Sequence, residues 1–234
     1  MHKESTDPLI DARAITKIYS GPGAGVVALS RLSFCVLRGE LVVISGISGS
    51  GKTTLLNILG CLDRPSVGQL FIGGVDTGPL RRDDLAGLRG ERIGFVFQHS
   101  HLIRHLTTLE NVLFPLVLAG IPADRDKGLA LLEAVGLAHR GDHKPAELSG
   151  GEQQKAAIAR ALIRDPDIIL ADEPTGNLDR RSGTHIIQLL TDLVGGPRER
   201  SVVIVTHQPE LVSAAQRKLL LVDGRLEHVL SLSV

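Results

Sequence analysis

Apolar and polar positions along the chain fall into short blocks that are typical of strands and helices in alternation. Apolar runs predict strands at 9–19, 26–36, 41–45, 69–72, 93–97, 167–171 and 201–206, and a C-terminal hairpin of 219–222 and 225–230. Helical periodicity is expected at 52–60, 107–119, 123–135, 150–164 and 183–194. Strands that alternate with helices predict an α/β fold with a parallel sheet covered on both faces.

The middle of the chain breaks this alternation. From about residue 99 to residue 164 the pattern is helical throughout and no strand is indicated, so we expect a helical insert. Residues 81–92 mix charges of both signs and are expected to form a solvated surface segment.

Composition narrows the classes of function. Lys and Arg total 26 and Asp and Glu total 26, so nothing suggests general nucleic-acid binding. Two cysteines are too few for a disulfide framework and fit a reducing compartment. The first residues lack the apolar run of a signal peptide, and the longest apolar stretch is too short to span a bilayer. Any membrane role would therefore need a partner.

The segment Gly46–Thr53 reads GISGSGKT and follows a predicted strand. Glycines at these positions let successive backbone N–H groups point at phosphate oxygens, at the positive end of the next helix. In such a loop Lys52 reaches the β- and γ-phosphates, and the Thr53 hydroxyl ligates Mg²⁺. The segment predicts a nucleotide triphosphate site.

A second candidate lies at the end of the predicted strand in DIILADEP, where Asp172 and Glu173 are adjacent. Neighbouring side chains on a strand point in opposite directions. One carboxylate can face a metal ion while the other faces the attacking water. We expect Asp172 to hold Mg²⁺ and Glu173 to act as the general base.

The segment LSGGEQQK, between these two motifs, resembles the signature of the ATP-binding cassette (ABC) ATPases. The resemblance implies that Ser149, Gly150, Gly151 and Glu152 bind nucleotide at the start of a helix. A serine and two glycines before a helix are also an ordinary helix cap, and the order of the three motifs favours the family.

Other family elements follow in the same order along the chain. By resemblance, Tyr19 stacks on adenine, Gln98 approaches Mg²⁺ and the attacking water, and His207 lies near the γ-phosphate. Residues 177–179 (NLD) are similar to the family's D-loop. The resemblance implies that ATP is bound by Tyr19, Gly46, Ile47, Ser48, Gly49, Ser50, Gly51, Lys52, Thr53, Thr54, Ser149, Gly150, Gly151 and Glu152.

The resemblance also implies a fold and partners. It implies one domain over residues 1–234, a P-loop NTPase of the ABC type with a mixed sheet and an N-terminal antiparallel β subdomain. Residues 99–164 would form a helical subdomain, and residues 1–98 and 165–234 the nucleotide-binding lobe. The signature of a second copy would cover each phosphate loop, so a head-to-tail homodimer is expected.

Phrases such as RIGFVFQ and LADEPTGNLD are similar to the lipoprotein-releasing and macrolide-export branch. This branch implies a separate integral-membrane permease and a peripheral place on the cytoplasmic face of the bacterial inner membrane. Lys155 and Ala156 depart from the residues usual after the signature. The alternative is an ATPase of the cell-division type, which signals through a membrane partner without transport.

Two features around residue 100 allow both a functional and a structural interpretation. His99, His101 and His105 could ligate a metal, but no fourth ligand accompanies them, so a metal site is not favoured. The nearby apolar residues are expected partly to pack internally and partly to form an exposed patch for the permease. They are Leu102, Ile103, Leu106, Leu109 and Phe114.

Overall fold

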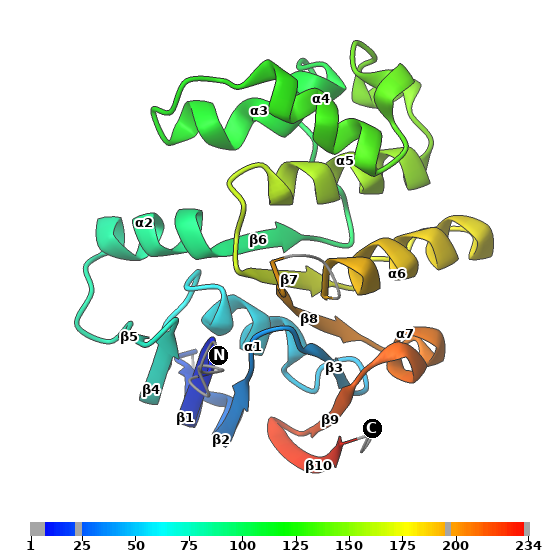
Figure 1. Ribbon diagram of the computed structural model, residues 1–234. Coiled ribbons are helices and arrows are strands. Elements are labelled where there is room, and N and C mark those ends of the chain that lie inside the picture. The colour runs from blue at the N-terminus through cyan, green and yellow to red at the C-terminus, as the bar shows by residue number, and fades with distance from the viewer. Residues whose placement is uncertain (1–7, 22–24, 195–197, 232–234) are drawn as a thin grey trace, which may run out of the picture.

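The computed structural model describes residues 8–21, 25–194 and 198–231 (Figure 1). Two sheets form its framework. The smaller sheet is antiparallel, with the strand order β2-β1-β4-β5. Its strands are β1 (Ile10–Tyr19), β2 (Val26–Val36), β4 (Val67–Ile72) and β5 (Val75–Asp76).

The larger sheet has six strands in the order β10-β9-β3-β8-β7-β6. All neighbours in it are parallel except β10, which closes an antiparallel hairpin with β9. Its strands are β3 (Leu41–Ser45), β6 (Ile93–Val96), β7 (Ile168–Asp172), β8 (Ser201–Thr206), β9 (Arg217–Val222) and β10 (Arg225–Ser231). The predicted α/β class, the mixed large sheet and the antiparallel β subdomain are confirmed.

Seven α-helices lie in the part of the chain that the structure describes. They are α1 (Lys52–Leu59), α2 (Arg82–Arg92), α3 (Thr108–Leu118), α4 (Arg125–Ala134), α5 (Gly150–Leu162), α6 (Arg180–Val194) and α7 (Pro209–Ala214). The five expected helices are present, with ends shifted by three residues or fewer. Short 3-10 turns lie at Ala138–Arg140 and Pro145–Glu147.

The sequence prediction missed α2, α7 and β5. Helix α2 lies in the expected solvated segment, and only Leu85 among its residues is buried. Two acids in its first turn and two arginines in its last complement the helix dipole, which explains how so polar a segment becomes helical. The segment was expected to lie at the surface, and it does, but its helical structure was not predicted.

Successive residues of the large sheet belong to two different cores. On β3, Val42 and Ile44 pack with α1 and the antiparallel sheet, whereas Leu41 and Val43 pack with α3, α5 and α6. Strands β7 and β8 alternate in the same way, as expected for a sheet buried on both faces. Helix α1 therefore lies on one face of the sheet, and helices α3, α5 and α6 lie on the other (Figure 1).

Residues between β6 and β7 are helical, as expected, and Figure 1 shows α3, α4 and α5 as a group beyond the large sheet. Buried Asn111 on α3 holds the segment that leads into it. Its side chain accepts from the Ile103 N–H at 2.7 Å and donates to the carbonyls of Ile103, Leu106 and Thr107. No helix among the described residues is long and apolar enough to cross a membrane.

Candidate active site

Three neighbouring strands deliver the candidate residues to one edge of the large sheet. Strand β8 lies between β3 and β7, and the three are parallel, so their carboxyl ends meet. The phosphate loop follows β3, the pair Thr206 and His207 closes β8, and Asp172 and Glu173 close β7. Such an edge is where α/β sheets bind ligands.

The phosphate loop is built on close backbone approach. A Cβ at Gly46 would lie 2.3 Å from the Leu221 carbonyl oxygen, so only glycine fits there. Gly51 caps α1 with a φ of +102° and supplies no side-chain cap, so the first N–H groups of α1 have no side-chain partner there. The buried Ser50 hydroxyl also has no hydrogen-bond partner among the described residues. These are the features of an anion cradle.

Lys52 lies across this loop. Its Nζ donates to the carbonyl oxygens of Gly46 at 2.8 Å and Ile47 at 2.9 Å. The contacts place a positive charge inside the cradle, where phosphate oxygens would lie.

Two side-chain oxygens converge beside the loop. Thr53 Oγ1 donates to Asp172 Oδ2 at 3.3 Å, although the two residues are 119 positions apart. Burial raises the pKa of the Asp172 carboxyl, and the charge of Glu173 raises it further, whereas Thr53 and Lys52 act in the opposite direction. A half-buried carboxylate next to a hydroxyl fits a hard cation such as Mg²⁺.

Glu173 is held at both carboxylate oxygens. Thr206 Oγ1 donates to Oε2 at 2.9 Å, and His207 Nδ1 lies 2.7 Å from Oε1. The backbone of Glu173 has a φ of +44°, a conformation that non-glycine residues adopt rarely and mostly at functional sites. Thr206 itself accepts from the Gln208 N–H at 3.0 Å, so the carboxylate is fixed by a network.

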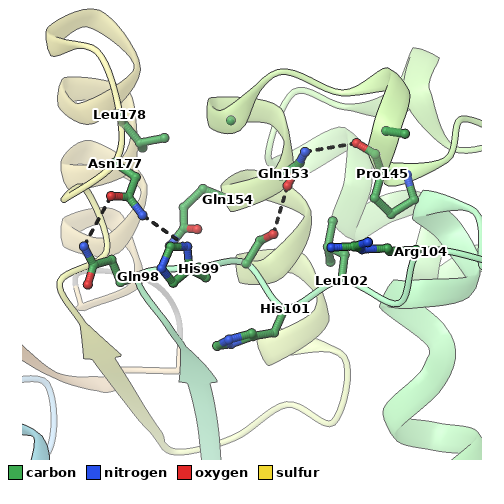
Figure 2. Close-up of a pocket in the computed structure, with 13 residues that line it drawn as sticks. Gln98, His99, His101, Leu102, Arg104, Pro145, Gln153, Gln154, Asn177 and Leu178 are labelled. Atoms are coloured by element: carbon green, nitrogen blue, oxygen red, sulfur yellow. Dashed lines mark hydrogen bonds between the residues drawn. The ribbon is translucent and has the colours of Figure 1, made fainter.

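The structure places Gln98 at the end of a hydrogen-bonded chain. Gln98 Nε2 donates to Asn177 Oδ1 at 3.3 Å, and Asn177 Nδ2 lies 3.3 Å from His99 Nδ1 (Figure 2). No hydrogen bond joins Gln98 to Asp172 or Glu173 within the described ranges. Its side chain instead lies against Gly176, whose Cβ would be 3.0 Å from Nε2.

The hydrogen-bonded side chains of Gln98, Asn177 and His99 border a groove of about 650 Å³ between the end of β6 and the helical segment (Figure 2). The groove is lined by Gln98, His99, Ser100, His101, Leu102, Arg104, Pro145, Ala146, Gly150, Gln153, Gln154, Asn177 and Leu178. Arg160 holds the lining loop by donating to the carbonyls of Ser100 and His101. The lining contains Arg104 and two histidines but no acidic residue.

The apolar residues expected at this seam do pack internally in part, but none of the five is exposed, so the expectation of an exposed apolar patch was wrong. Leu109 is buried, and the other four apolar residues are half-buried, with Leu102 packed against the core and lining a groove of mixed polar and apolar side chains. The strongly exposed apolar side chains near the end of α3 are Val117 and Leu118 instead. The helical segment needs most of its apolar side chains for its own core.

The histidines of this region mostly serve packing and hydrogen bonding. The His101 ring packs edge-on against Phe97, and the rings of His99 and His101 are 6.1 Å apart. Among the described residues, no group of three or more His, Cys, Asp or Glu could hold a metal ion.

The signature serine lies elsewhere on the molecule. Ser149 caps α5 in a capping box with Glu152, whose carboxylate accepts from the Ser149 N–H and hydroxyl, each at 2.8 Å. These hydrogen bonds lower the pKa of Glu152, and Arg140 donates to the same carboxylate at 2.9 Å. Helix α5 packs on the face of the sheet opposite α1, so the chain does not bring its own signature to its own phosphate loop.

Tyr19 ends β1 with an exposed ring that contacts Lys17 and Asp63. Neither contact was predicted, and neither was the role of Thr206 or of the Asn177 amide. Thr206 could have been noticed because it directly follows an apolar strand beside His207.

Comparison with known proteins identifies the family. Residues 29–176 match the family model described as ABC transporter. An ABC transporter ATP-binding protein of Thermotoga maritima is 48% identical over 217 residues, covering 92% of each chain. The chain belongs to the ABC transporter family, and it is an ATP-binding, ATP-hydrolysing P-loop ATPase subunit.

Two further similarities refine this assignment. The macrolide export ATP-binding/permease protein MacB of Burkholderia pseudomallei is 45% identical over 223 residues, yet the chain spans only 34% of that relative. The ATP-binding cassette MJ0796, solved as a dimer bound to ADP and Pi in a post-hydrolysis state, superimposes with a TM-score of 0.89 at 41% identity. That match covers 96% of this chain and 99% of the other.

Proposed function

We propose that the chain is the ATP-hydrolysing subunit that powers a transporter and that it works as a head-to-tail homodimer. The observation that carries this proposal is the separation of the two half-sites. The phosphate loop starts α1 on one face of the large sheet, whereas Ser149 starts α5 on the other. A second copy turned head to tail supplies the missing half, and the dimeric relative bound to ADP and Pi supports this arrangement.

Within each copy the residues divide the work. The whole chain is one domain, with a nucleotide lobe of residues 1–98 and 165–234 and a helical subdomain of residues 99–164. ATP phosphates lie in the loop 46–54, where Lys52 contacts the β- and γ-phosphates, and Tyr19 stacks on the base. Ser149, Gly150, Gly151 and Glu152 of the partner copy cover the γ-phosphate.

The geometry supports a mechanism by general-base hydrolysis. Thr53, Asp172 and Gln98 would hold Mg²⁺, which when bound would supply positive charge that offsets the charge of the phosphate oxygens. Glu173 accepts a proton from water as the water oxygen attacks the γ-phosphorus and the bond to ADP breaks. Thr206 and His207 keep the carboxylate in place, and His207 would also contact the γ-phosphate.

Mixing two inactive variants tests the shared site. Ser149→Arg and Lys52→Ala damage opposite halves of each site, so a mixed dimer has one site with both defects and one with neither. We expect ATPase activity to return in the mixture and to be absent from each variant alone. An inactive mixture in which a cysteine crosslink between positions 149 and 50 of opposite copies also fails to form would refute the head-to-tail arrangement.

We further propose that the chain drives a separate permease at the cytoplasmic face of the inner membrane and exports or releases a hydrophobic substrate such as a lipoprotein. The macrolide export relatives support this class of substrate. The groove in Figure 2 is the proposed docking site. Because its lining includes the cationic side chain of Arg104 and no acidic residue, the docking segment of the permease should present a carboxylate.

Leu102 is the residue with which to test this surface. It lines the groove and is half-buried, so Leu102→Glu should fold and keep its basal ATPase while losing co-purification with a permease encoded beside it. Leu118→Glu, at an exposed position of α3 outside the groove, is the matched control and should still co-purify. Retained binding by a folded Leu102→Glu protein would exclude the groove. A division protein in place of a permease would favour the signalling alternative.

A further inference from the structure

Tyr19 belongs to a closed cluster of three side chains at the end of β1. The Nζ of Lys17 lies 4.9 Å from the centroid of the Tyr19 ring, within the range of a cation–π contact. The Tyr19 hydroxyl donates to Asp63 Oδ2 at 3.0 Å, and Lys17 Nζ donates to Asp63 Oδ1 at 2.6 Å. The ring is thus held at one face and at its hydroxyl, and its residue remains 41% exposed.

Further hydrogen bonds tie this cluster to the helix that begins in the phosphate loop. The Asp63 N–H donates to the Asn57 carbonyl of α1 at 3.2 Å. Lys17 Nζ makes a second contact with the Arg64 carbonyl at 2.8 Å. Helix α1 has eight residues and is therefore about 12 Å long, so the cluster and the phosphate loop lie at opposite ends of one rigid element.

Two backbone N–H groups strengthen the link between the strand that carries Tyr19 and the segment that follows α1. Ser66 N–H donates to the Thr16 carbonyl at 2.8 Å, and the Ile18 N–H donates to Ser66 Oγ at 3.0 Å. The backbone on both sides of Lys17 is therefore fixed to the segment that follows α1.

The Asp63 carboxylate is stabilised in its charged form. Burial alone raises the pKa of the Asp63 carboxyl, but hydrogen bonds from Lys17, Arg64 and Tyr19 bring that pKa below its ordinary value. The Lys17 side chain is only 13% exposed, so the ion pair is partly shielded from water. The Lys17–Asp63 ion pair therefore restrains the Tyr19 ring, whereas a tyrosine at the end of a strand without such contacts could rotate freely.

We propose that Lys17 and Asp63 are positioning residues for nucleotide binding, which orient the Tyr19 ring so that its free face receives the base. The proposal rests on the proposed stacking role of Tyr19. Lys17 occupies one face of the ring, so the base stacks on the opposite face. Because the cluster and the phosphate loop lie at opposite ends of α1, the length of this helix sets the distance between the bound base and the bound phosphates.

Asp63→Asn keeps the size of the side chain and removes the charge that holds Lys17. We expect KM for ATP to rise about three- to tenfold, the effect of losing one hydrogen bond or cation–π contact, with kcat unchanged. The preference for ATP over UTP should fall. Affinity for inorganic tripolyphosphate, which has no base, should not weaken when measured by calorimetry in EDTA.

Comparison with Tyr19→Ala separates this proposal from the stacking role itself. Tyr19→Ala should weaken ATP binding, and adding Asp63→Asn to it should cause no further loss, because the residue that Asp63 positions is gone. If Tyr19→Ala binds ATP normally, the stacking role fails. If Tyr19→Ala weakens binding but the two effects add, stacking stands and positioning by Asp63 is refuted.

Two further variants separate positioning of the ring from a simple effect of charge. Asp126→Asn removes an exposed carboxylate of α4 outside the cluster and should behave as wild type. If Asp63 acted only through its negative charge, its removal would tighten ATP binding, and that result would overturn the proposal. Lys17→Met should reproduce the Asp63→Asn effect, and a folded Lys17→Met protein with unchanged KM would overturn it too.

Discussion

Replacing Glu173 with glutamine keeps the size of the side chain and removes its ability to take a proton. In the structure each carboxylate oxygen has one partner, with Thr206 Oγ1 at 2.9 Å and His207 Nδ1 at 2.7 Å. The amide oxygen of glutamine can keep the Thr206 contact, so the side chain should stay in place. Loss of a general base costs about 10²- to 10⁴-fold in kcat, or about 2.7–5.4 kcal/mol in the barrier.

The cost to folding should be much smaller. The residue His207 is largely exposed, so water screens its contact with Glu173, and we expect a loss below about 1 kcal/mol. ATP affinity should be retained because the phosphate loop is unchanged. The variant should therefore accumulate as an ATP-bound dimer.

The assay combines phosphate release, calorimetry with ATP and size-exclusion chromatography with ATP present. Glu210→Gln on α7 is the matched control, because it makes the same chemical change at an exposed position and should keep wild-type turnover. Turnover of Glu173→Gln within threefold of wild type would remove this residue from the role of base. Loss of ATP binding together with turnover would show that Glu173 supports the site's structure instead.

Three other substitutions or reactions test separate features. Lys52→Ala removes a charge-assisted contact to the phosphates and should weaken ATP binding about 10- to 100-fold in calorimetry, and unchanged affinity would contradict the cradle. Because burial raises the pKa of Asp172, its ionised form destabilises the nucleotide-free fold, and wild-type stability should fall as pH rises through that raised value. At pH values above that pKa, Asp172→Asn should raise the melting temperature of the nucleotide-free protein and remove this pH dependence. It should also abolish the extra stabilisation that Mg²⁺ gives with ATP. A lower melting temperature of the nucleotide-free variant would refute the argument. Burial raises the pKa of Cys61 to about 11, so at pH 8 about one thiol in a thousand is ionised and iodoacetamide should label half-buried Cys35 first, as mass spectrometry would show.

Sequence patterns predicted the parts of this fold whose causes are local. Strands β3, β7 and β8 are short apolar runs, and the glycines of the phosphate loop are needed by the backbone at their own positions. The approach of Thr53 to Asp172 follows from the general arrangement of such loops, and the structure places the two oxygens 3.3 Å apart.

The remaining features depend on contacts between distant segments. Nothing near Tyr19 in the sequence indicates Asp63, which reaches it because α1 returns to the end of β1. The apolar residues around Leu102 could pack inward or face a partner, and only the packing of α3 against α5 decides between these outcomes. Helix α2 was missed because most of its residues are charged or glycine, and only Leu85 among them is buried.

The position of β8 has a consequence for the dimensions of the site. All six residues of this strand are buried, and the strand separates β3, which leads to the phosphate loop, from β7, which ends in the two acids. Adjacent strands lie about 4.8 Å apart, so the bases of these two motifs are about 10 Å apart. Backbone hydrogen bonds set this width, and side-chain volume has little influence on it. Substitutions within β8 can therefore change the free energy of unfolding while the distance from the phosphate loop to the carboxylates stays the same.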